Sequence, residues 1–539
     1  MTLFPSRRLA LAVLASIAIA GAHCDRFEAV GHLSAAEAGI DAHVAPDAAA
    51  VDAGDAGDSV GRTLLDDCEP GDASGLSAET IATLMKGGDE GLTWLYPYDG
   101  TVFPSGLQAP LVMWGGSTGD AVYVRLHSMS FEYRGCLAPT AAGQLVFPQR
   151  GWDLAQAVTA GAADPFTLEL TVITGGKVLG PISEHVVIAA GALPGSLYYM
   201  TLGSTLGGAM TIGEMSIVRV RPGHAAELAL GSGGCTGCHS LSADGSHLIA
   251  NASSMGSSFT LSATSSPVPL LSPTPGGEYA ALVPDGSLYL ATAHPTGGGP
   301  RSYGAGASMN ATLYETATGS AIVDTGIPAG ATVPSFSADG AHLAFNDPAI
   351  TGGNGLALME FSESSRQASN YRVVFTNASQ YPGWPTFLPD GKAVVFSLGA
   401  ASDYSGGGTG LGVITPGPAT DVYLVDASSH ASTILARAMG FATSADAASN
   451  TTYLPYGAGD IHQNFDPYVS PAASGGYAWV FFDSRRNYGN VGLLRAVWCA
   501  AVDVSGDGIY AIDPSHPAFL LPGQELTTSN FRPVPVVDP

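Results

Sequence analysis

The sequence predicts an all-β protein, with an N-terminal sandwich followed by a propeller of six or seven blades. Three observations predict this fold class. The 539 residues include 70 glycines and only 12% charged residues, a composition that suits turn-rich β structure. Short alternating strands follow one another between residues 90 and 190. From residue 191 onward, an Asp-Gly turn followed by an apolar strand recurs along the chain.

Residues 1–22 have the features of a secretory signal peptide. Arg7 and Arg8 precede a short apolar segment, and Ala20-Gly21-Ala22 fits the small-residue rule for cleavage. That segment is too short to span a membrane, and we expect no transmembrane segment in the mature chain. Cys24 offers a lipid attachment site, although His23 stands where a lipoprotein signal has a small residue. We expect an exported protein, periplasmic or at the cell surface, with a lipid anchor to the outer membrane as one alternative.

Residues 23–66 are expected to form a disordered tether. Aspartates separated by small residues recur along it, at Asp41, Asp47, Asp52, Asp55 and Asp58. Such a composition cannot bury enough apolar surface to fold. A short helix is predicted near residues 78–85, with Ser77 as its N-cap.

Residues 90–190 are predicted to form a sandwich of immunoglobulin or fibronectin type. Strand-like runs occupy residues 111–114, 121–126 and 166–172, with Gly and Pro between them. Residues 115–119 match the G-x-S-x-G pattern of a hydrolase nucleophile elbow. That elbow requires a helix after the serine, whereas here a strand follows, so we predict a hairpin turn.

Residues 191–539 are predicted to form the propeller. Four Asp-Gly turns are each followed by an apolar strand, and their aspartates are Asp244, Asp285, Asp339 and Asp390. The turns lie 41, 54 and 51 residues apart, and periods of this length are typical of propeller blades. Residues 466–482 provide a further unit, and the irregular segments bring the expected number of blades to six or seven.

Cys235-Thr236-Gly237-Cys238-His239 is a C-x-x-C-H motif, the attachment signature of c-type haem. Two thiols at this spacing bond to the vinyl groups of one porphyrin, and the imidazole of His239 ligates the iron. The motif occurs once, so we expect at most one haem c. A disulfide between the two cysteines is an alternative, and so is another metal ion with His247 or His224 as an added ligand.

The second axial ligand of the iron is left open by the sequence, with candidates Met255, His224, Met215 and His247. Ligation by methionine raises the reduction potential, whereas an open position permits small-molecule chemistry.

The Ser-x-Asp-Gly turns before apolar strands resemble those of the TolB-type propeller family, over residues 220–520. The C-x-x-C-H run directly before the first turn resembles a subgroup of secreted bacterial propellers with a haem motif in an early blade. Residues 484–489 and 513–519 are similar to the closing segments of that subgroup. The resemblance implies that Cys235, Cys238 and His239 bind haem. No helical domain surrounds the motif, which sets the chain apart from small c-type cytochromes.

The other candidate residues have mainly structural predictions. Cys68 and Cys136 are expected to form a disulfide, and Cys499 to be buried and free. Asp503–Gly508 begins like a calcium loop, but Pro514 stands where the last ligand should be acidic, so a turn is predicted. Two further expectations concern the propeller. Arg485 and Arg486 are expected to pair with carboxylates and so hold the last blade in place. The candidates for side chains that line the central channel are His462, Asp466 and Tyr488.

The net charge of −26 argues against nucleic acid as a partner, because phosphate binding needs clustered Lys and Arg. The single haem motif in an exported chain instead predicts an electron-transfer protein with an unidentified redox partner protein. Two alternatives stay open: a surface propeller that binds a protein or ligand without haem, and a haem-dependent oxidoreductase. No catalytic residue is predicted, so the sequence leaves open whether the chain is an enzyme.

Overall fold

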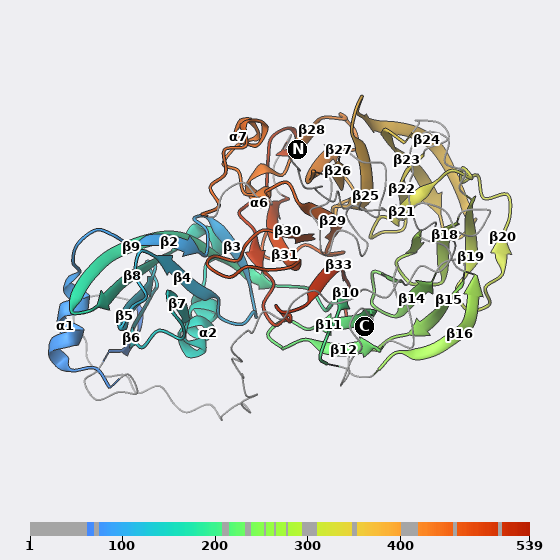
Figure 1. Cartoon of the computed structure of the whole chain (residues 1–539). Helices are drawn as coiled ribbons and strands as arrows, with labels where there is room; N and C mark the ends of the chain where they lie inside the picture. The colour runs from blue at the N-terminus through green and yellow to red at the C-terminus, as the bar shows by residue number, and fades with distance from the viewer. Residues whose placement is uncertain are drawn as a thin grey trace, which may run out of the picture.

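The computed structural model describes residues 62–68, 75–206, 215–231, 239–252, 255–262, 266–275, 279–293, 310–347, 353–399, 419–455, 461–504 and 509–538. The signal peptide, Cys24 and most of the expected tether lie outside these ranges, as do Cys235 and Cys238. Strands dominate the described residues, as predicted. Two parts are visible in Figure 1, a smaller one built by the N-terminal third of the chain and a ring of sheets built by the rest.

The N-terminal part consists of two sheets. A six-stranded sheet has the order β1-β6-β5-β8-β9-β3, and a three-stranded sheet has the order β2-β4-β7. The strands are β1 (Thr63–Asp67), β2 (Thr93–Tyr96), β3 (Thr101–Ser105), β4 (Leu111–Gly115), β5 (Ala121–His127), β6 (Phe131–Leu137), β7 (Gln144–Val146), β8 (Phe166–Thr174) and β9 (Lys177–Ala192). Large aromatic side chains fill the space between the sheets and helix α2 (Gln149–Val158), among them Trp114, Phe147 and Trp152.

Two local predictions in this part are confirmed. Helix α1 (Ala78–Lys86) begins after Ser77, whose side-chain oxygen accepts a hydrogen bond from the amide of Thr80 at 3.1 Å. The G-x-S-x-G run is a turn between β4 and β5, in which the amide of Gly119 donates to Ser117 Oγ at 3.2 Å.

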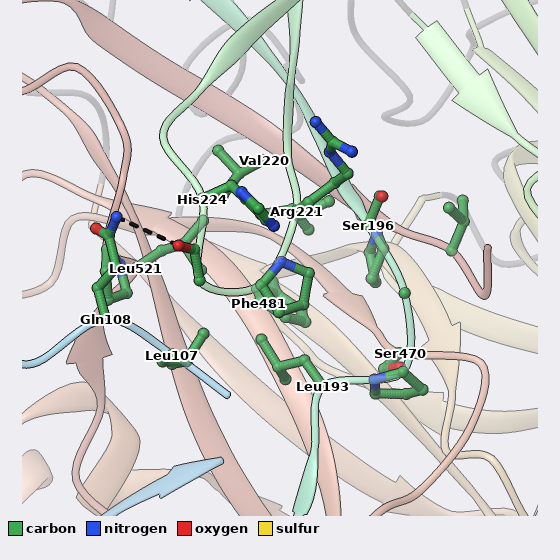
Figure 2. A pocket seen from close by; sticks show the side chains of 18 residues that line it. Leu107, Gln108, Leu193, Ser196, Val220, Arg221, His224, Ser470, Phe481 and Leu521 are labelled. Atoms are coloured by element: carbon green, nitrogen blue, oxygen red, sulfur yellow. Dashed lines mark hydrogen bonds between the residues drawn. The ribbon is translucent and has the colours of Figure 1, made fainter. Parts of the chain in front are cut away.

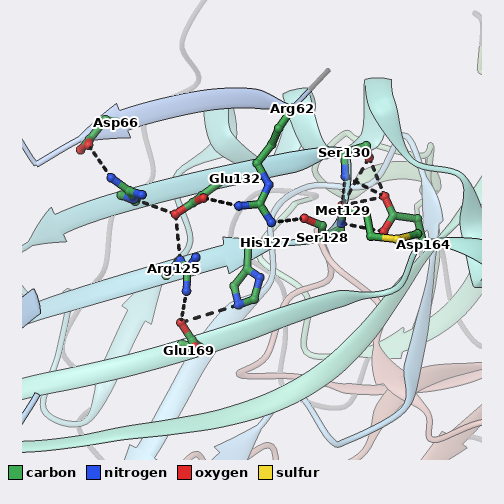
Figure 3. A network of polar contacts seen from close by, with 11 residues as sticks. Arg62, Asp66, Arg125, His127, Ser128, Met129, Ser130, Glu132, Asp164 and Glu169 are labelled. Carbon is green, nitrogen blue, oxygen red and sulfur yellow. Dashed lines mark hydrogen bonds and ion pairs between the residues drawn. The ribbon is translucent and has the colours of Figure 1, made fainter. Parts of the chain in front are cut away.

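The predicted tether is too long at its C-terminal end, because residues 63–66 belong to β1. This strand pairs in parallel with β6, and ion pairs on the sheet surface hold it there (Figure 3). The carboxylate of Glu132 forms ion pairs with three arginines, with nitrogen–oxygen distances of 2.6 Å to Arg62, 2.9 Å to Arg125 and 2.7 Å to Arg134. Burial alone would raise the pKa of Glu132, but the arginine hydrogen bonds outweigh it and hold that pKa below its ordinary value.

The expected disulfide is present. Cys68, directly after β1, is bonded to Cys136 on β6, and their Cα atoms lie 4.7 Å apart. Cys499 is buried and free, as predicted, and burial raises the pKa of its thiol.

The second part is a propeller of six four-stranded sheets, which agrees with the lower predicted number. Blade 1 is β12-β11-β10-β33, and blades 2 to 6 follow in chain order (Figure 1). The innermost strands are β33 (Ser529–Pro535), β13 (His239–Leu241), β17 (Tyr279–Leu282), β21 (Thr332–Phe336), β25 (Tyr381–Phe387) and β29 (Asn464–Val469). Because β33 pairs with β10 (Leu197–Leu202), the C-terminal strand completes the blade that begins the ring.

The outer strands of the six blades are antiparallel neighbours within each sheet. They are β11 (Met215–Val220), β12 (Glu227–Leu230), β14 (His247–Ala252), β15 (Met255–Thr260), β16 (Val268–Pro275), β18 (Leu288–Ala293), β19 (Asn310–Glu315), β20 (Ala321–Ile322), β22 (His342–Asn346), β23 (Gly355–Ser362), β24 (Gln367–Thr376), β26 (Ala393–Gly399), β27 (Thr420–Asp426), β28 (Ser432–Ile434), β30 (Tyr477–Ser484), β31 (Ala496–Asp503) and β32 (Phe519–Leu520).

Both parts share one hydrophobic core. The same cluster of buried side chains includes Trp152 of the sandwich and Trp479 and Trp498 of blade 6. Phe103 on β3 packs on Phe519 on β32, with ring centroids 5.1 Å apart. The sandwich is therefore packed against blade 6.

Candidate haem site and propeller axis

Of the three residues of the haem motif, the structure describes His239. It is the first residue of β13, the inner strand of blade 2, and its side chain is completely buried. Cys235 and Cys238 lie outside the described residues, so the structure does not test whether they lie beside His239. Leu241, on the same face of this strand, packs with Tyr198 and Val534 of blade 1.

The ring nitrogens of His239 have no hydrogen-bond partner among the described residues. Burial lowers the pKa of His239 to about 3, and the charge of Arg532 adds to the effect. Backbone groups of Tyr198 and Arg532 lie beside the ring and oppose this shift, but none meets hydrogen-bond geometry. The imidazole is therefore neutral near pH 7, the form that ligates a metal.

The donor chemistry of this position fits a haem ligand. A buried imidazole normally uses both nitrogens in hydrogen bonds, so two unpartnered nitrogens are unusual. A haem iron needs one such nitrogen from the protein on its proximal side. Among the described residues no group of three His, Cys, Asp or Glu side chains is placed to hold a metal ion.

A backbone irregularity recurs on four inner strands. A residue in the left-handed region precedes a proline at Val333-Pro334, Trp384-Pro385, Asp466-Pro467 and Arg532-Pro533, with φ of 48°, 51°, 48° and 57° at the first residue. At each of these places the pairing with the next strand shifts in register. Proline is tolerated because the inner strand is the edge of its sheet and has no ladder partner on the axis side.

These irregular positions bring side chains together across the axis. The guanidinium of Arg532 (blade 1) lies 4.4 Å from the ring centroid of Trp384 (blade 5). Tyr279 (blade 3) meets the same tryptophan edge-on at 5.6 Å, and Val333 (blade 4) packs in the same cluster. Since Arg532, Tyr279 and Trp384 come from three blades of which no two are neighbours, they must meet at the centre of the ring.

Beside this cluster lies a group of completely buried charges. Arg495 forms an ion pair with Asp483, and its guanidinium lies 3.7 Å from the carboxylate of Asp466. Burial raises the pKa of both aspartates, which the nearby arginine charges oppose. Arg495 also lies over the ring of Phe465, at 4.4 Å from its centroid.

Asp466 lies on the inner strand of blade 6, as a channel position requires, but Trp384 and Arg532 were not predicted. A signal for Trp384 was present, because an X-Pro dipeptide stands six residues before the turn aspartate in blades 4 and 5, at Val333-Pro334 and Trp384-Pro385. This repeat marks Val333 and Trp384, but it does not mark Arg532.

The structure gives the other two channel candidates other surroundings. Tyr488 packs in the shared core rather than at the axis, 4.7 Å from Tyr96 between ring centroids, because its position after β30 faces the sandwich. The Nδ1 of His462 pairs with Asp421 at 2.6 Å and its Nε2 with Asn450 Oδ1 at 2.7 Å. The hydrogen bond to Asp421 raises the pKa of His462.

The arginine prediction is half right. Arg486 is buried and does tie blade 6, but its partners are neutral oxygens rather than carboxylates. It donates to Ala438 O and Asn464 Oδ1, both at 2.8 Å, and lies over the rings of Phe482 and Trp498. Burial lowers its pKa.

The four candidate second ligands of the iron lie on blades 1 and 2. Met215 and Met255 begin β11 and β15. His247 begins β14, and its Nδ1 is engaged with Ser246 Oγ at 2.7 Å. His224 lines a cavity of about 20 Å³ between blade 1 and the sandwich, where Gln108 donates to Gly223 O (Figure 2). That volume holds roughly one water molecule.

Comparison with known proteins supplies structural likeness only. No protein-family model and no curated protein matches the chain. Among solved structures, TolB from Acinetobacter baumannii matches with 12% identity and a TM-score of 0.38, covering 70% of this chain and 80% of that one. A putative TolB from Agrobacterium tumefaciens matches with 12% identity and a TM-score of 0.33, covering 63% and 98%.

A third similar structure is the hydrazine synthase of Kuenenia stuttgartiensis, at 12% identity and a TM-score of 0.30, covering 57% of this chain and 82% of that one. The propeller assignment rests on the strand order described above rather than on these likenesses. No helix among the described residues is long and apolar enough to cross a membrane. The chain is a six-bladed β-propeller protein with an N-terminal β-sandwich, and TolB proteins are among the structures it resembles.

Proposed function

We propose that this chain is an exported electron-transfer protein whose propeller carries one c-type haem. Cys235 and Cys238 would form the thioether bonds, and His239 would ligate the iron. The observation that carries the proposal is the buried, neutral His239, whose ring nitrogens have no hydrogen-bond partner among the described residues and which directly follows the C-x-x-C sequence. When bound, haem supplies a one-electron redox centre, and a redox partner protein exchanges electrons with it.

Two further observations support the proposal. Cys238 stands six residues before Asp244, the same offset that separates Tyr279, Val333 and Trp384 from their turn aspartates. By this spacing we expect the attachment point to lie close to the axis. The Cys68–Cys136 disulfide suits an oxidising compartment, where c-type haem is attached. The signal peptide of residues 1–22 would direct export, and lipidation of Cys24 would anchor the protein to the outer membrane.

The roles of this chain's own residues follow from their positions. Burial keeps the His239 imidazole unprotonated, so it is available to the iron without competition from protons. The positive charge of Arg532 beside that imidazole favours the reduced state of a centre bound there. The side chains clustered around Trp384 are buried, and an apolar surrounding of this kind strengthens such an electrostatic effect.

The experiment is expression in a host that attaches c-type haem, followed by a haem stain of the denatured protein and an intact mass. We expect a stained band and a mass increment of one porphyrin, both absent from Cys235→Ala. In His239→Ala we expect attachment through the cysteines with an altered visible spectrum. A colourless protein without the mass increment would overturn the proposal.

The second candidate is a propeller that binds a partner or ligand without haem, and one observation favours it. His239 has no exposed surface, as expected of a histidine that only fills the core. On this reading the colourless protein would retain its stability, and Cys235 and Cys238 would be found as a disulfide by mass spectrometry.

A further inference from the structure

A cleft of about 480 Å³ lies between the sandwich and the propeller, away from the axis. On the sandwich side its walls come from β2, the turn before β3, and β9. On the propeller side they come from α6 (Ala436–Met439), the segment that follows it, and the residues after β31. Small-molecule sites of roughly 300–1,000 Å³ are common at such domain boundaries.

One wall of the cleft is aromatic and fixed in place. Tyr98 lines it and contacts three other rings, with centroid distances of 5.4 Å to Tyr96, 5.5 Å to Tyr453 and 6.4 Å to Trp498. The hydroxyl of Tyr453 donates to Arg437 O at 2.6 Å, and the indole nitrogen of Trp94 donates to Pro97 O at 2.6 Å. Tyr98 is 5% exposed and supports this wall, whereas the partly exposed Trp94 offers an apolar ring face to a ligand at little cost in conformational entropy.

Polar groups of both hydrogen-bonding kinds line the same cleft. Asp99 and Glu184 are carboxyl groups of the same lining, and Asp99 accepts a hydrogen bond from the amide of His185 at 2.9 Å and pairs with His185 Nδ1 at 3.0 Å. Burial, with the charge of Asp99, raises the pKa of Glu184 to about 8. Near pH 7 the pair is therefore one carboxylate and one carboxylic acid, an acceptor beside a donor.

The charges in the cleft favour a neutral ligand. With Glu184 protonated, the carboxylate of Asp99 and the guanidinium of Arg437 are opposite charges in the same lining. His516, the other basic group of the lining, is held by Asp503 at 3.2 Å. A ligand with many hydroxyl groups and an apolar face matches this combination of aromatic wall, carboxyl pair and arginine.

We propose that this cleft binds a carbohydrate, with a pyranose ring against Trp94 and its hydroxyls hydrogen-bonded to Asp99, Glu184 and Arg437. The proposal is independent of haem attachment, because the lining contains no residue of the haem motif.

The test is titration of the full chain with cellobiose, chitobiose and maltose, followed by tryptophan fluorescence and calorimetry. We expect saturable binding of at least one disaccharide at millimolar concentration or below. Glu184→Ala and Trp94→Ala should each weaken it about tenfold, since each removes a direct contact. The matched control is Glu363→Ala in blade 4, where another glutamate has a pKa raised by burial and by a nearby aspartate, Asp285.

Three outcomes would overturn the proposal. One is that none of the three disaccharides gives a saturable signal. Another is binding that survives both Glu184→Ala and Trp94→Ala. The last is an equal loss of binding in Glu363→Ala, which would place the effect outside the cleft. Thermal melting of each variant confirms that it is folded, and Glu184→Ala alone decides the matter if Trp94→Ala does not fold.

Discussion

At the scale of single residues, the propeller centre depends on a buried group of charges. Arg495 is completely buried together with Asp483 and Asp466, and the energetic cost of removing these groups from water is offset only while they stay paired. The same arginine stacks on Phe465, so both its charge and its planar shape are used.

We expect Arg495→Met to destabilise the protein by about 3–5 kcal/mol, because it leaves two carboxylates buried without a counter-charge. Urea denaturation measures the loss. The control is Arg366→Met, which removes an exposed ion pair to Glu315 at 2.8 Å and should cost less than about 1 kcal/mol. Equal losses in the two variants would show that the buried pairing contributes nothing special.

A second residue-scale feature is the carboxylate of Asp164, which receives four hydrogen bonds (Figure 3). They come from Ser128 Oγ, the amide of Met129, and the amide and hydroxyl of Ser130, at 2.6 to 3.1 Å. Burial opposes ionisation, but these bonds outweigh it and hold the pKa of Asp164 below its ordinary value.

Asp164→Asn should therefore destabilise the protein by about 1–3 kcal/mol at neutral pH. A lowered folded-state pKa adds stability above the ordinary aspartate pKa of about 4, and that stability is lost as the pH falls through the folded-state value. The difference between wild type and variant should shrink below about pH 4. Urea denaturation at several pH values measures it, with the exposed Asp153→Asn as control. A difference that stays constant with pH would contradict this account.

At the scale of elements, closure of the ring depends on one strand from the far end of the chain. β33 supplies the inner edge of blade 1 and buries Phe531, Val534 and Arg532. Without it, the edge of β10 would face the axis unpaired, and the contacts of Arg532 with Trp384 would be lost.

Deletion of residues 529–539 should abolish the cooperative melting of the propeller, because one blade then lacks its inner strand. Calorimetry and limited proteolysis measure this. Deletion of residues 538–539 is the control. It removes one hydrogen bond, from Ser196 N to Asp538 at 3.2 Å, and should cost about 1 kcal/mol. An unchanged transition in the longer deletion would mean that closure is not required.

The sequence predicts the elements best where one local pattern defines them. As expected, each Asp-Gly turn joins the inner strand of a blade to the second strand of the same blade, at Asp244, Asp285, Asp339 and Asp390. Blade 1 has no such signature, because its strands come from opposite ends of the chain and pair only after the ring closes. Blade 6 turns through Ser474 and Gly475 instead of Asp-Gly, so its period is hidden.

The candidate site was predictable only in part, for a related reason. The C-x-x-C-H spacing identifies His239 from local sequence, but its burial against Arg532 depends on contacts between blades 1 and 2. Likewise, Trp384 and Tyr279 are 105 residues apart in sequence, and only the closed ring brings them to 5.6 Å. No local pattern encodes such meetings.

At the scale of the whole molecule, the shared core makes the sandwich and propeller one cooperative unit. Trp152, on helix α2 of the sandwich, and Trp498, on β31 of the propeller, belong to the same buried cluster of apolar side chains. Domains joined by a polar interface unfold separately, whereas a continuous apolar core couples them.

We expect a single calorimetric transition, with near-ultraviolet and far-ultraviolet circular dichroism following the same curve. Trp152→Ala should shift that whole transition to lower temperature, at a cost of about 3–5 kcal/mol. The exposed Met129→Ala should leave it in place. Two separate transitions, with only the first moved by Trp152→Ala, would contradict the coupling.

The X-Pro irregularity on the inner strands has a consequence for engineering. At Val333, Trp384, Asp466 and Arg532, the bulge and the following proline fix the main chain, while the identity of the side chain differs from valine to arginine. The scaffold therefore tolerates an apolar, aromatic, acidic or basic group at the same geometric place. Substitution of these four side chains is therefore a direct way to change the polarity and charge at the centre of the ring.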